Sequence, residues 1–95
     1  MTEKSKRIKN YIVLTVDETD YRFENSHVAY GTYIDGLGRG KLVQASKNFL
    51  IQTIHNEDLA SLRDLFSANP GAALQIAAEL SDRIALQVEV AVKKQ

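Results

Sequence analysis

A change of hydrophobic period near residue 85 is the strongest constraint on the fold of this chain. Before it, residues 69–84 carry apolar side chains at the spacing of one helix face, namely Ala73, Ala77, Leu80 and Ile84. That spacing predicts an amphipathic helix. After it, residues 86–92 alternate between apolar and polar side chains, and a period of two predicts a β-strand. The chain therefore needs both helices and a sheet.

The N-terminal part of the sequence repeats the period of two. Residues 10–16 and 20–24 alternate on either side of an acidic segment, which predicts a β-hairpin with a loop of about four residues built on a type I turn. A hairpin of two strands is only marginally stable alone. We therefore expect residues 86–92 to add a third strand beside residues 10–16, in a three-stranded antiparallel sheet.

Helical patterns fill the middle of the chain. Asn25 or Ser26 is expected to cap a helix that ends near Asp35, and further helices are expected over residues 42–54 and from residue 56 to about residue 68. Gly31 indicates a close helix contact, and the glycine-rich residues 36–41 are expected to form a mobile loop. The prediction is one α+β domain over residues 1–95, with the sheet packed against three to four helices and residues 1–9 as a flexible tail.

The segment 42–54 carries more apolar side chains than one helix face can hold. Such a helix is either enclosed in the core or offers one face to a partner. The second alternative leads to a hypothesis about a binding surface. Its residues are expected to be Tyr33, Leu37, Leu42 and Phe49.

The sequence shows no pattern of catalytic or ligand-binding residues. It has no cysteine, its glycine-rich segment does not fit a phosphate-binding loop, and its two histidines lack the spacing of metal ligands. We therefore expect no enzymatic activity, no metal and no cofactor. The 12 basic and 12 acidic residues balance, which argues against nucleic-acid and membrane partners. No apolar run reaches the length that spans a bilayer, so a cytoplasmic location is expected.

Several short segments together resemble those of the small phage tail assembly chaperones found in prophages and long-tailed phages. They are Ala45–Leu50 around an Asn-Phe-Leu core, Asn56–Asp58 followed by Leu59 and Leu62, and Pro70–Ala77. The glycine-rich residues 36–41 depart from the family, whose members tend to have a more polar connection with a proline. The resemblance implies a non-enzymatic protein that coats the tape measure protein, keeps it soluble and is shed before the tail is complete.

The resemblance also implies a second partner, and self-association is a further possibility that the surplus apolar face raises. In many long-tailed phages a programmed frameshift near the stop codon adds an extension that recruits tail tube subunits. Lys93 and Lys94 fit an A-rich slippery run of codons, although lysines that solubilise a strand end explain them as well.

Two other functions compete with the chaperone hypothesis. Helices on both sides of Asn69 and Pro70 suggest a helix-turn-helix DNA-binding regulator, but residues 70–84 carry one basic side chain, Arg83, against Glu79 and Asp82. A structural subunit of a virion is the other alternative.

Overall fold

A two-stranded β-hairpin opens the part of the chain that the computed structural model describes, residues 11–85. Strand β1 is Tyr11–Val16, strand β2 is Thr19–Glu24, and their antiparallel register places Val16 opposite Thr19. The turn contains only Asp17 and Glu18, with φ angles of 50° and 70°. Two successive left-handed residues make a type I′ turn, whose twist matches that of paired strands. The longer type I loop predicted from the sequence is therefore wrong.

The predicted three-stranded sheet is also wrong, because the sheet of the described residues has two strands, β1 and β2. Residues 86–92, which were expected to supply the third strand, lie outside the described residues. On its other edge β2 meets the residue that follows the second helix: Phe23 forms an isolated bridge with Ile54. The hairpin is thus extended on the β2 side by a short contact rather than by a full strand.

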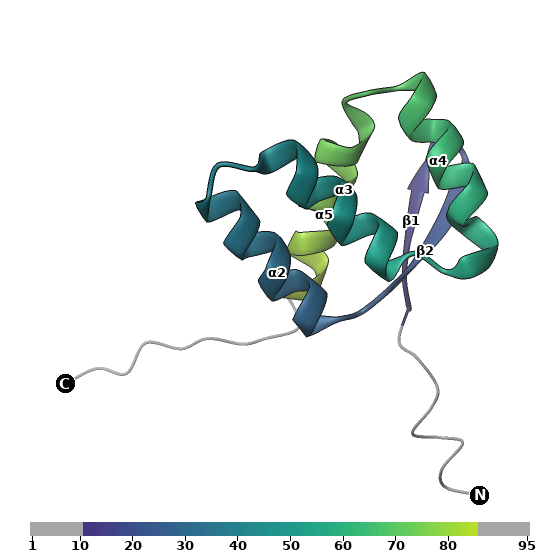
Figure 1. The fold of residues 1–95 in the computed structure, drawn as a ribbon. Coiled ribbons are helices and arrows are strands. Elements are labelled where there is room, and N and C mark those ends of the chain that lie inside the picture. The colour runs from purple at the N-terminus through teal and green to yellow at the C-terminus, as the bar shows by residue number, and fades with distance from the viewer. Residues whose placement is uncertain (1–10, 86–95) are drawn as a thin grey trace, which may run out of the picture.

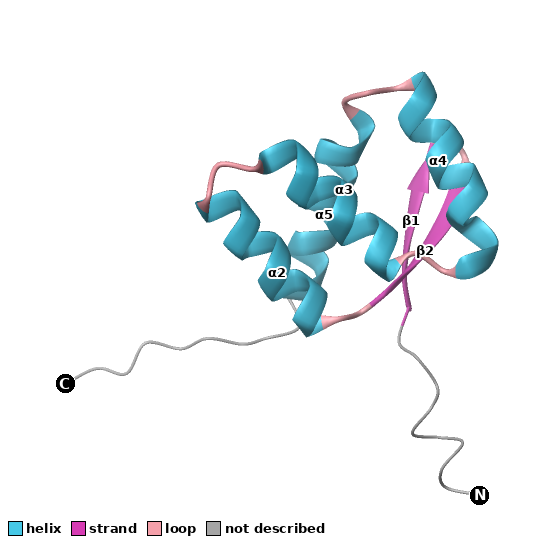
Figure 2. Ribbon diagram, in the orientation of Figure 1, coloured by secondary structure: helices cyan, strands magenta, loops and turns pink. Residues whose placement is uncertain are grey.

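Four α-helices and one short 3-10 helix, η1, follow the hairpin within residues 11–85 (Figures 1 and 2). Their bounds are α2 His27–Gly38, α3 Leu42–Thr53, η1 Asn56–Asp58, α4 Leu59–Ala68 and α5 Ala72–Ala85. Ser26 is the N-cap of α2, and its Oγ accepts a hydrogen bond of 3.1 Å from the N–H of Ala29. This bond satisfies one of the N–H groups that a helix start leaves without a partner.

Two helix boundaries differ from the sequence prediction. Helix α2 continues to Gly38 instead of ending near Asp35, so the expected glycine-rich loop shrinks to residues 39–41. Helix α5 begins at Ala72 rather than at the start of the predicted segment 69–84, because residues 69–72 form a turn in which the N–H of Ala72 donates to the carbonyl of Asn69 at 2.9 Å.

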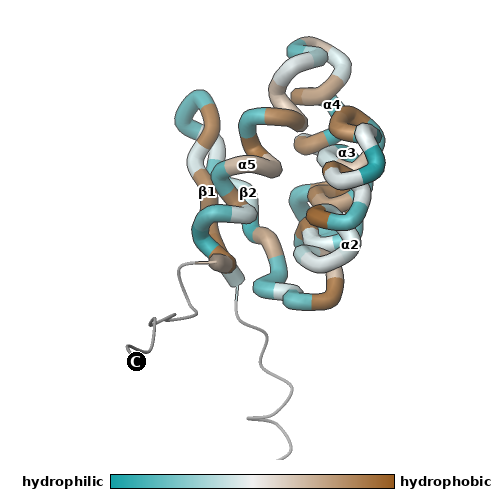
Figure 3. Tube along the Cα trace, turned by 90° about the vertical axis from the view of Figure 1, so that its left-hand side faces the viewer, coloured by the Kyte–Doolittle hydropathy of each residue, from teal (hydrophilic) through white to brown (hydrophobic). Residues whose placement is uncertain are grey.

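Helix α5 lies at the centre of the molecule. Figure 3 shows the hairpin on one side of α5 and the antiparallel pair α2–α3 on the other. The apolar face of α5 that the sequence predicted is buried, because the hairpin and the α2–α3 pair both pack against α5. The largest fully buried side chains come from most of these elements: Phe23, Phe49, Leu50, Leu62, Leu80 and Ile84.

Candidate functional site

Helices α2 and α3 approach each other most closely where Gly36 faces Ala45. A Cβ atom added at Gly36 would lie 2.7 Å from the Cβ of Ala45, closer than real carbon atoms pack. At Gly31, where the sequence suggested a close contact, a Cβ atom would meet nothing within 4 Å. A close approach between α2 and α3 is therefore present, but it lies at Gly36 and not at the predicted Gly31.

A stacked pair of aromatic rings joins the two helices beyond this contact. The ring centroids of Tyr33 and Phe49 are 4.6 Å apart, and the ring planes differ by 20°. The side chains are 5% and 1% exposed respectively. Burial raises the pKa of the Tyr33 hydroxyl, so this ring remains neutral at physiological pH and acts as a packing group.

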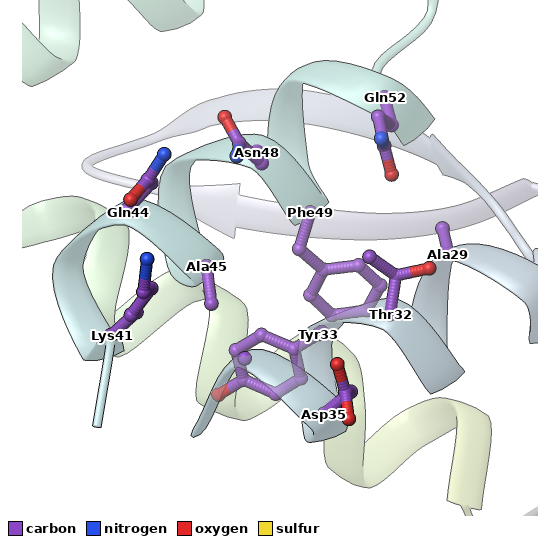
Figure 4. Close-up of a pocket in the computed structure, with 11 residues that line it drawn as sticks. Ala29, Thr32, Tyr33, Asp35, Lys41, Gln44, Ala45, Asn48, Phe49 and Gln52 are labelled. Atoms are coloured by element: carbon purple, nitrogen blue, oxygen red, sulfur yellow. The ribbon is translucent and has the colours of Figure 1, made fainter. Parts of the chain in front are cut away.

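A pocket of about 180 Å³ opens above these rings, between α2 and α3. We call it the α2–α3 pocket (Figure 4). Ala29, Thr32 and Gly36 line it from α2, and Ala45 and Phe49 line it from α3. The α3 side also contributes a row of neutral amides at intervals of four residues: Gln44, Asn48 and Gln52.

Charge around the α2–α3 pocket is sparse and balanced. Its lining contains one acid, Asp35, and one base, Lys41. Asp35 already accepts a hydrogen bond of 2.9 Å from Nε of Arg39. An apolar floor beneath a neutral polar rim suits a ligand surface that is itself apolar with polar margins, rather than a phosphate or another strongly charged group.

The structure brings together two of the four side chains that the sequence proposed as a binding surface. Tyr33 and Phe49 both line the α2–α3 pocket, from its floor. Leu37 is partly buried against the core, and Leu42 is 49% exposed on the first turn of α3. Neither leucine lines the pocket, although Leu42 lies seven residues before Phe49 and so on the same face of the helix.

A cluster of charges that sequence analysis missed joins β2 to the end of η1, just before α4. Asp58 accepts hydrogen bonds from Nε of Arg22 at 3.0 Å, from Nη2 at 2.9 Å and from the backbone N–H of Arg22 at 2.9 Å. Glu57 lies 3.3 Å from the same guanidinium. These bonds lower the pKa of Asp58 to about 2. The residues lie 36 positions apart, so no local pattern could have indicated their contact.

Within residues 11–85, no group of three or more His, Asp or Glu side chains is placed to hold a metal ion. In the same part of the chain, no helix is both long and apolar enough to cross a membrane. His55 caps η1: its Nδ1 accepts a 3.1 Å hydrogen bond from the N–H of Glu57.

Comparisons with known proteins add a family and a related fold. A sequence model of the family described as phage tail assembly chaperone matches residues 12–94. No curated protein matches the chain. Among solved structures, an uncharacterised protein from Bacillus stearothermophilus aligns over 97% of this chain and 96% of its own, with a TM-score of 0.68 and 19% sequence identity. At that identity the similarity shows a shared fold.

Proposed function

Because this chain belongs to the phage tail assembly chaperone family, we propose that it binds the tape measure protein while the tail tube is built. The family match over residues 12–94 is the observation that carries this proposal. Family membership gives the chain a chaperone role in tail assembly. The identity of its partner, the tape measure protein, is the proposed part. Binding would keep apolar segments of that long protein apart until tube subunits enclose them.

We place the binding site at the α2–α3 pocket. Two neighbouring antiparallel helices with a depression between them can receive the apolar ridge of a third, amphipathic helix. Small residues in the lining, Ala29, Gly36 and Ala45, allow such a ridge to come close. The amides of Gln44 and Asn48 can both donate and accept hydrogen bonds, so they suit polar side chains along the margin of the bound helix.

The four side chains singled out from the sequence have different roles in this site. Tyr33 and Phe49 hold the shape of the floor, since both are almost completely buried. Leu42, which is about half exposed, extends the apolar surface at the start of α3. Leu37 packs against the core at the end of α2 and supports that extension.

The wider function follows from the same premise. We propose that the protein acts by binding and not by catalysis, and that it does so in the cytoplasm of the host cell, where tails assemble. The tail tube protein is a second proposed partner, which would allow tube subunits to be delivered to the coated tape measure protein. Self-association is a third proposed interaction.

Binding of the tape measure protein can be tested with the full chain and fragments that tile the tape measure protein of the same phage. Co-expression should keep at least one fragment soluble that aggregates when it is expressed alone. Native mass spectrometry should then show a complex of defined stoichiometry. If no fragment is solubilised and none forms a complex, the tape measure protein is not the partner.

A pair of tryptophan variants tests the location of the site. Asn48→Trp places a bulky ring in the α2–α3 pocket and should weaken binding of the fragment at least about tenfold, because the ridge of the bound helix loses its space. Val43→Trp is the matched control, since Val43 is 54% exposed on α3 and does not line the pocket. Isothermal titration calorimetry measures both.

The two results separate the partner from the site. A fragment that binds wild type, Asn48→Trp and Val43→Trp equally well would leave the tape measure protein as partner and remove the α2–α3 pocket as its site. Circular dichroism of both variants checks that each remains folded.

A further inference from the structure

Strand β1 has one edge that pairs with β2 and one that faces away from it. The two-residue turn makes Val16 and Thr19 a hydrogen-bonded pair, and such pairs alternate with non-hydrogen-bonded ones along an antiparallel ladder. Ile12 and Leu14 therefore bond to β2, whereas Tyr11, Val13 and Thr15 direct their N–H and C=O groups outward. No backbone hydrogen bond between residues 11–85 reaches these outward groups.

The outer edge of β2, by contrast, is covered at its middle, around Arg22. The N–H of Arg22 donates to Asp58 at 2.9 Å, and the carbonyl of Arg22 accepts from the N–H of His55 at 2.8 Å. The bridge between Phe23 and Ile54 lies beside these bonds. In the described part of the chain, the fold thus closes one edge of the hairpin and leaves the β1 edge open.

The side chains of β1 lack the features that normally protect an open edge. The strand has the sequence Tyr-Ile-Val-Leu-Thr-Val, without a charge, a proline or a glycine. Tyr11 is 40% exposed and Val13 is 51% exposed. Natural edge strands commonly carry lysine, proline or a bulge, because an uncharged strand of high β-propensity pairs readily with another strand. An edge of this composition is suited to pairing.

There is space for another strand beside β1. A depression of about 610 Å³, the β1–α5 pocket, is lined by Val13–Asp17 of β1 and by Gln75, Ile76, Glu79 and Arg83 of α5. Glu79 and Arg83 form an ion pair with each other at 3.0 Å, so this border of the pocket has no net charge. Figure 3 shows β1 as the outer strand of the hairpin, on the side away from α2 and α3.

We propose that β1 pairs antiparallel with β1 of a second copy of this chain, with the two-fold axis at Val13. This register places Val13 opposite Val13 and Tyr11 opposite Thr15. The three outward residues are symmetric about Val13, so every outward N–H and C=O group finds a partner, in about six hydrogen bonds across the axis. The two hairpins become one four-stranded sheet, which is more stable than an isolated pair of strands.

The composition of β1 favours a second copy as the occupant of this edge. A two-fold axis brings each residue of the strand against another residue of the same strand, so a charged residue near the axis would meet a like charge. β1 has no charged residue. In the proposed register Ile12 of one copy lies opposite Leu14 of the other, which adds an apolar contact above Ile76 in the β1–α5 pocket.

The proposed dimer does not rest on the proposed function. Helices α2 and α3, whose residues line the α2–α3 pocket, lie on the other side of α5 from the hairpin (Figure 3). Pairing through β1 therefore leaves both copies of that pocket accessible, and a dimer would offer two sites to one long partner. Binding of two sites by one chain raises the apparent affinity without any new contact.

Charge variants at Val13 test the dimer in the full chain. Sedimentation velocity over a range of concentrations should show wild type forming dimers. Val13→Glu and Val13→Lys should each raise the dissociation constant of the dimer at least about tenfold, because two like charges then meet at the axis. An equimolar mixture of the two variants should form a heterodimer, since the charges are then opposite.

A matched control separates the β1 edge from general surface effects. Val28 is 82% exposed on α2, far from β1 in sequence, and Val28→Glu should dimerise as wild type does. Within the hairpin Val13 faces Arg22, so Val13→Glu places an acid opposite a base rather than opposite a like charge and should remain folded, which circular dichroism checks. Wild type that stays monomeric to about millimolar concentration, or a folded Val13→Glu that dimerises as wild type does, overturns the proposal.

Hydrogen exchange identifies the occupant of the edge directly. The N–H of Val13 should be protected in wild type, and its protection should increase with protein concentration. Protection that is independent of concentration would mean that another part of the same chain covers β1. An unprotected Val13 in a solution that contains dimers would place the interface elsewhere. Either result overturns the proposal.

Discussion

Among single residues, Arg22 and Asp58 form the contact with the clearest electrostatic consequence. Three hydrogen bonds from Arg22 hold the Asp58 carboxylate, and they fix β2 to the segment that leads into α4. The Arg22 side chain is 39% exposed, whereas the Asp58 side chain is 15% exposed. Because Asp58 also bonds the backbone N–H of Arg22, this pair positions the β2 backbone, which an ordinary surface ion pair does not do.

This contact predicts a dependence of stability on acidity. The pKa of Asp58 is lowered from its ordinary value of 3.8 to about 2 in the folded chain, chiefly by hydrogen bonds from Arg22. A lowered pKa stabilises the fold fully above the unfolded value, and this contribution is lost as the pH falls through the folded value. The difference in unfolding free energy between wild type and Asp58→Asn should therefore shrink between about pH 5 and pH 2. Urea denaturation at several pH values measures it, and a constant difference would contradict the assignment.

At the scale of elements, the contact between α2 and α3 depends on one glycine. Gly36→Ala would place a Cβ atom 2.7 Å from the Cβ of Ala45, so the helices must move apart, at a cost of about 1–3 kcal/mol of unfolding free energy. Gly31→Ala in the same helix meets nothing within 4 Å and should stabilise by about 0.5–1 kcal/mol, since alanine favours helix over glycine.

Denaturant unfolding of the two variants compares the same substitution at two sites in one helix. The double variant Gly36→Ala with Ala45→Gly should regain part of the lost stability, because the missing Cβ atom of residue 45 restores the space. Equal effects of the two glycine substitutions would show that helix propensity, and not the contact with α3, decides the outcome.

At the scale of the whole molecule, the fold rests on one thin core with α5 in its centre. Phe49 belongs to that core, with 1% of its surface exposed. Phe49→Ala should therefore lower the unfolding free energy by about 3–5 kcal/mol. A domain of this size has a total of about 5–10 kcal/mol, so a large fall in the melting temperature should follow.

Differential scanning calorimetry measures this fall. The exposed control Val28→Ala should change the unfolding free energy by no more than about 0.5 kcal/mol. A Phe49→Ala variant with nearly unchanged stability but impaired binding of a tape measure fragment would instead make Phe49 a contact residue rather than a support for the pocket floor.

The sequence by itself determined the elements that depend on neighbours along the chain. A helix cap at Asn25 or Ser26, the helical spacing of α5 and the alternation of β1 act over a few residues, so pattern and propensity were sufficient to predict them; the structure then selected Ser26 as the cap. The family resemblance was also recognisable from short segments, and the match over residues 12–94 confirms it. These features identify an α+β domain of the chaperone family, but they do not determine how its elements pack together.

Only the tertiary structure decided which residues meet across the chain. The space beside a glycine depends on a neighbouring helix, so spacing alone could not distinguish Gly36 from Gly31. The contact of Arg22 with Asp58 joins residues 36 positions apart, and the bridge of Phe23 with Ile54 likewise joins segments far apart in the sequence. Burial of Phe49 on α3 was likewise decided by its stacking on Tyr33. Such contacts depend on excluded volume and burial in three dimensions. The spacing of apolar residues along the sequence does not contain that information.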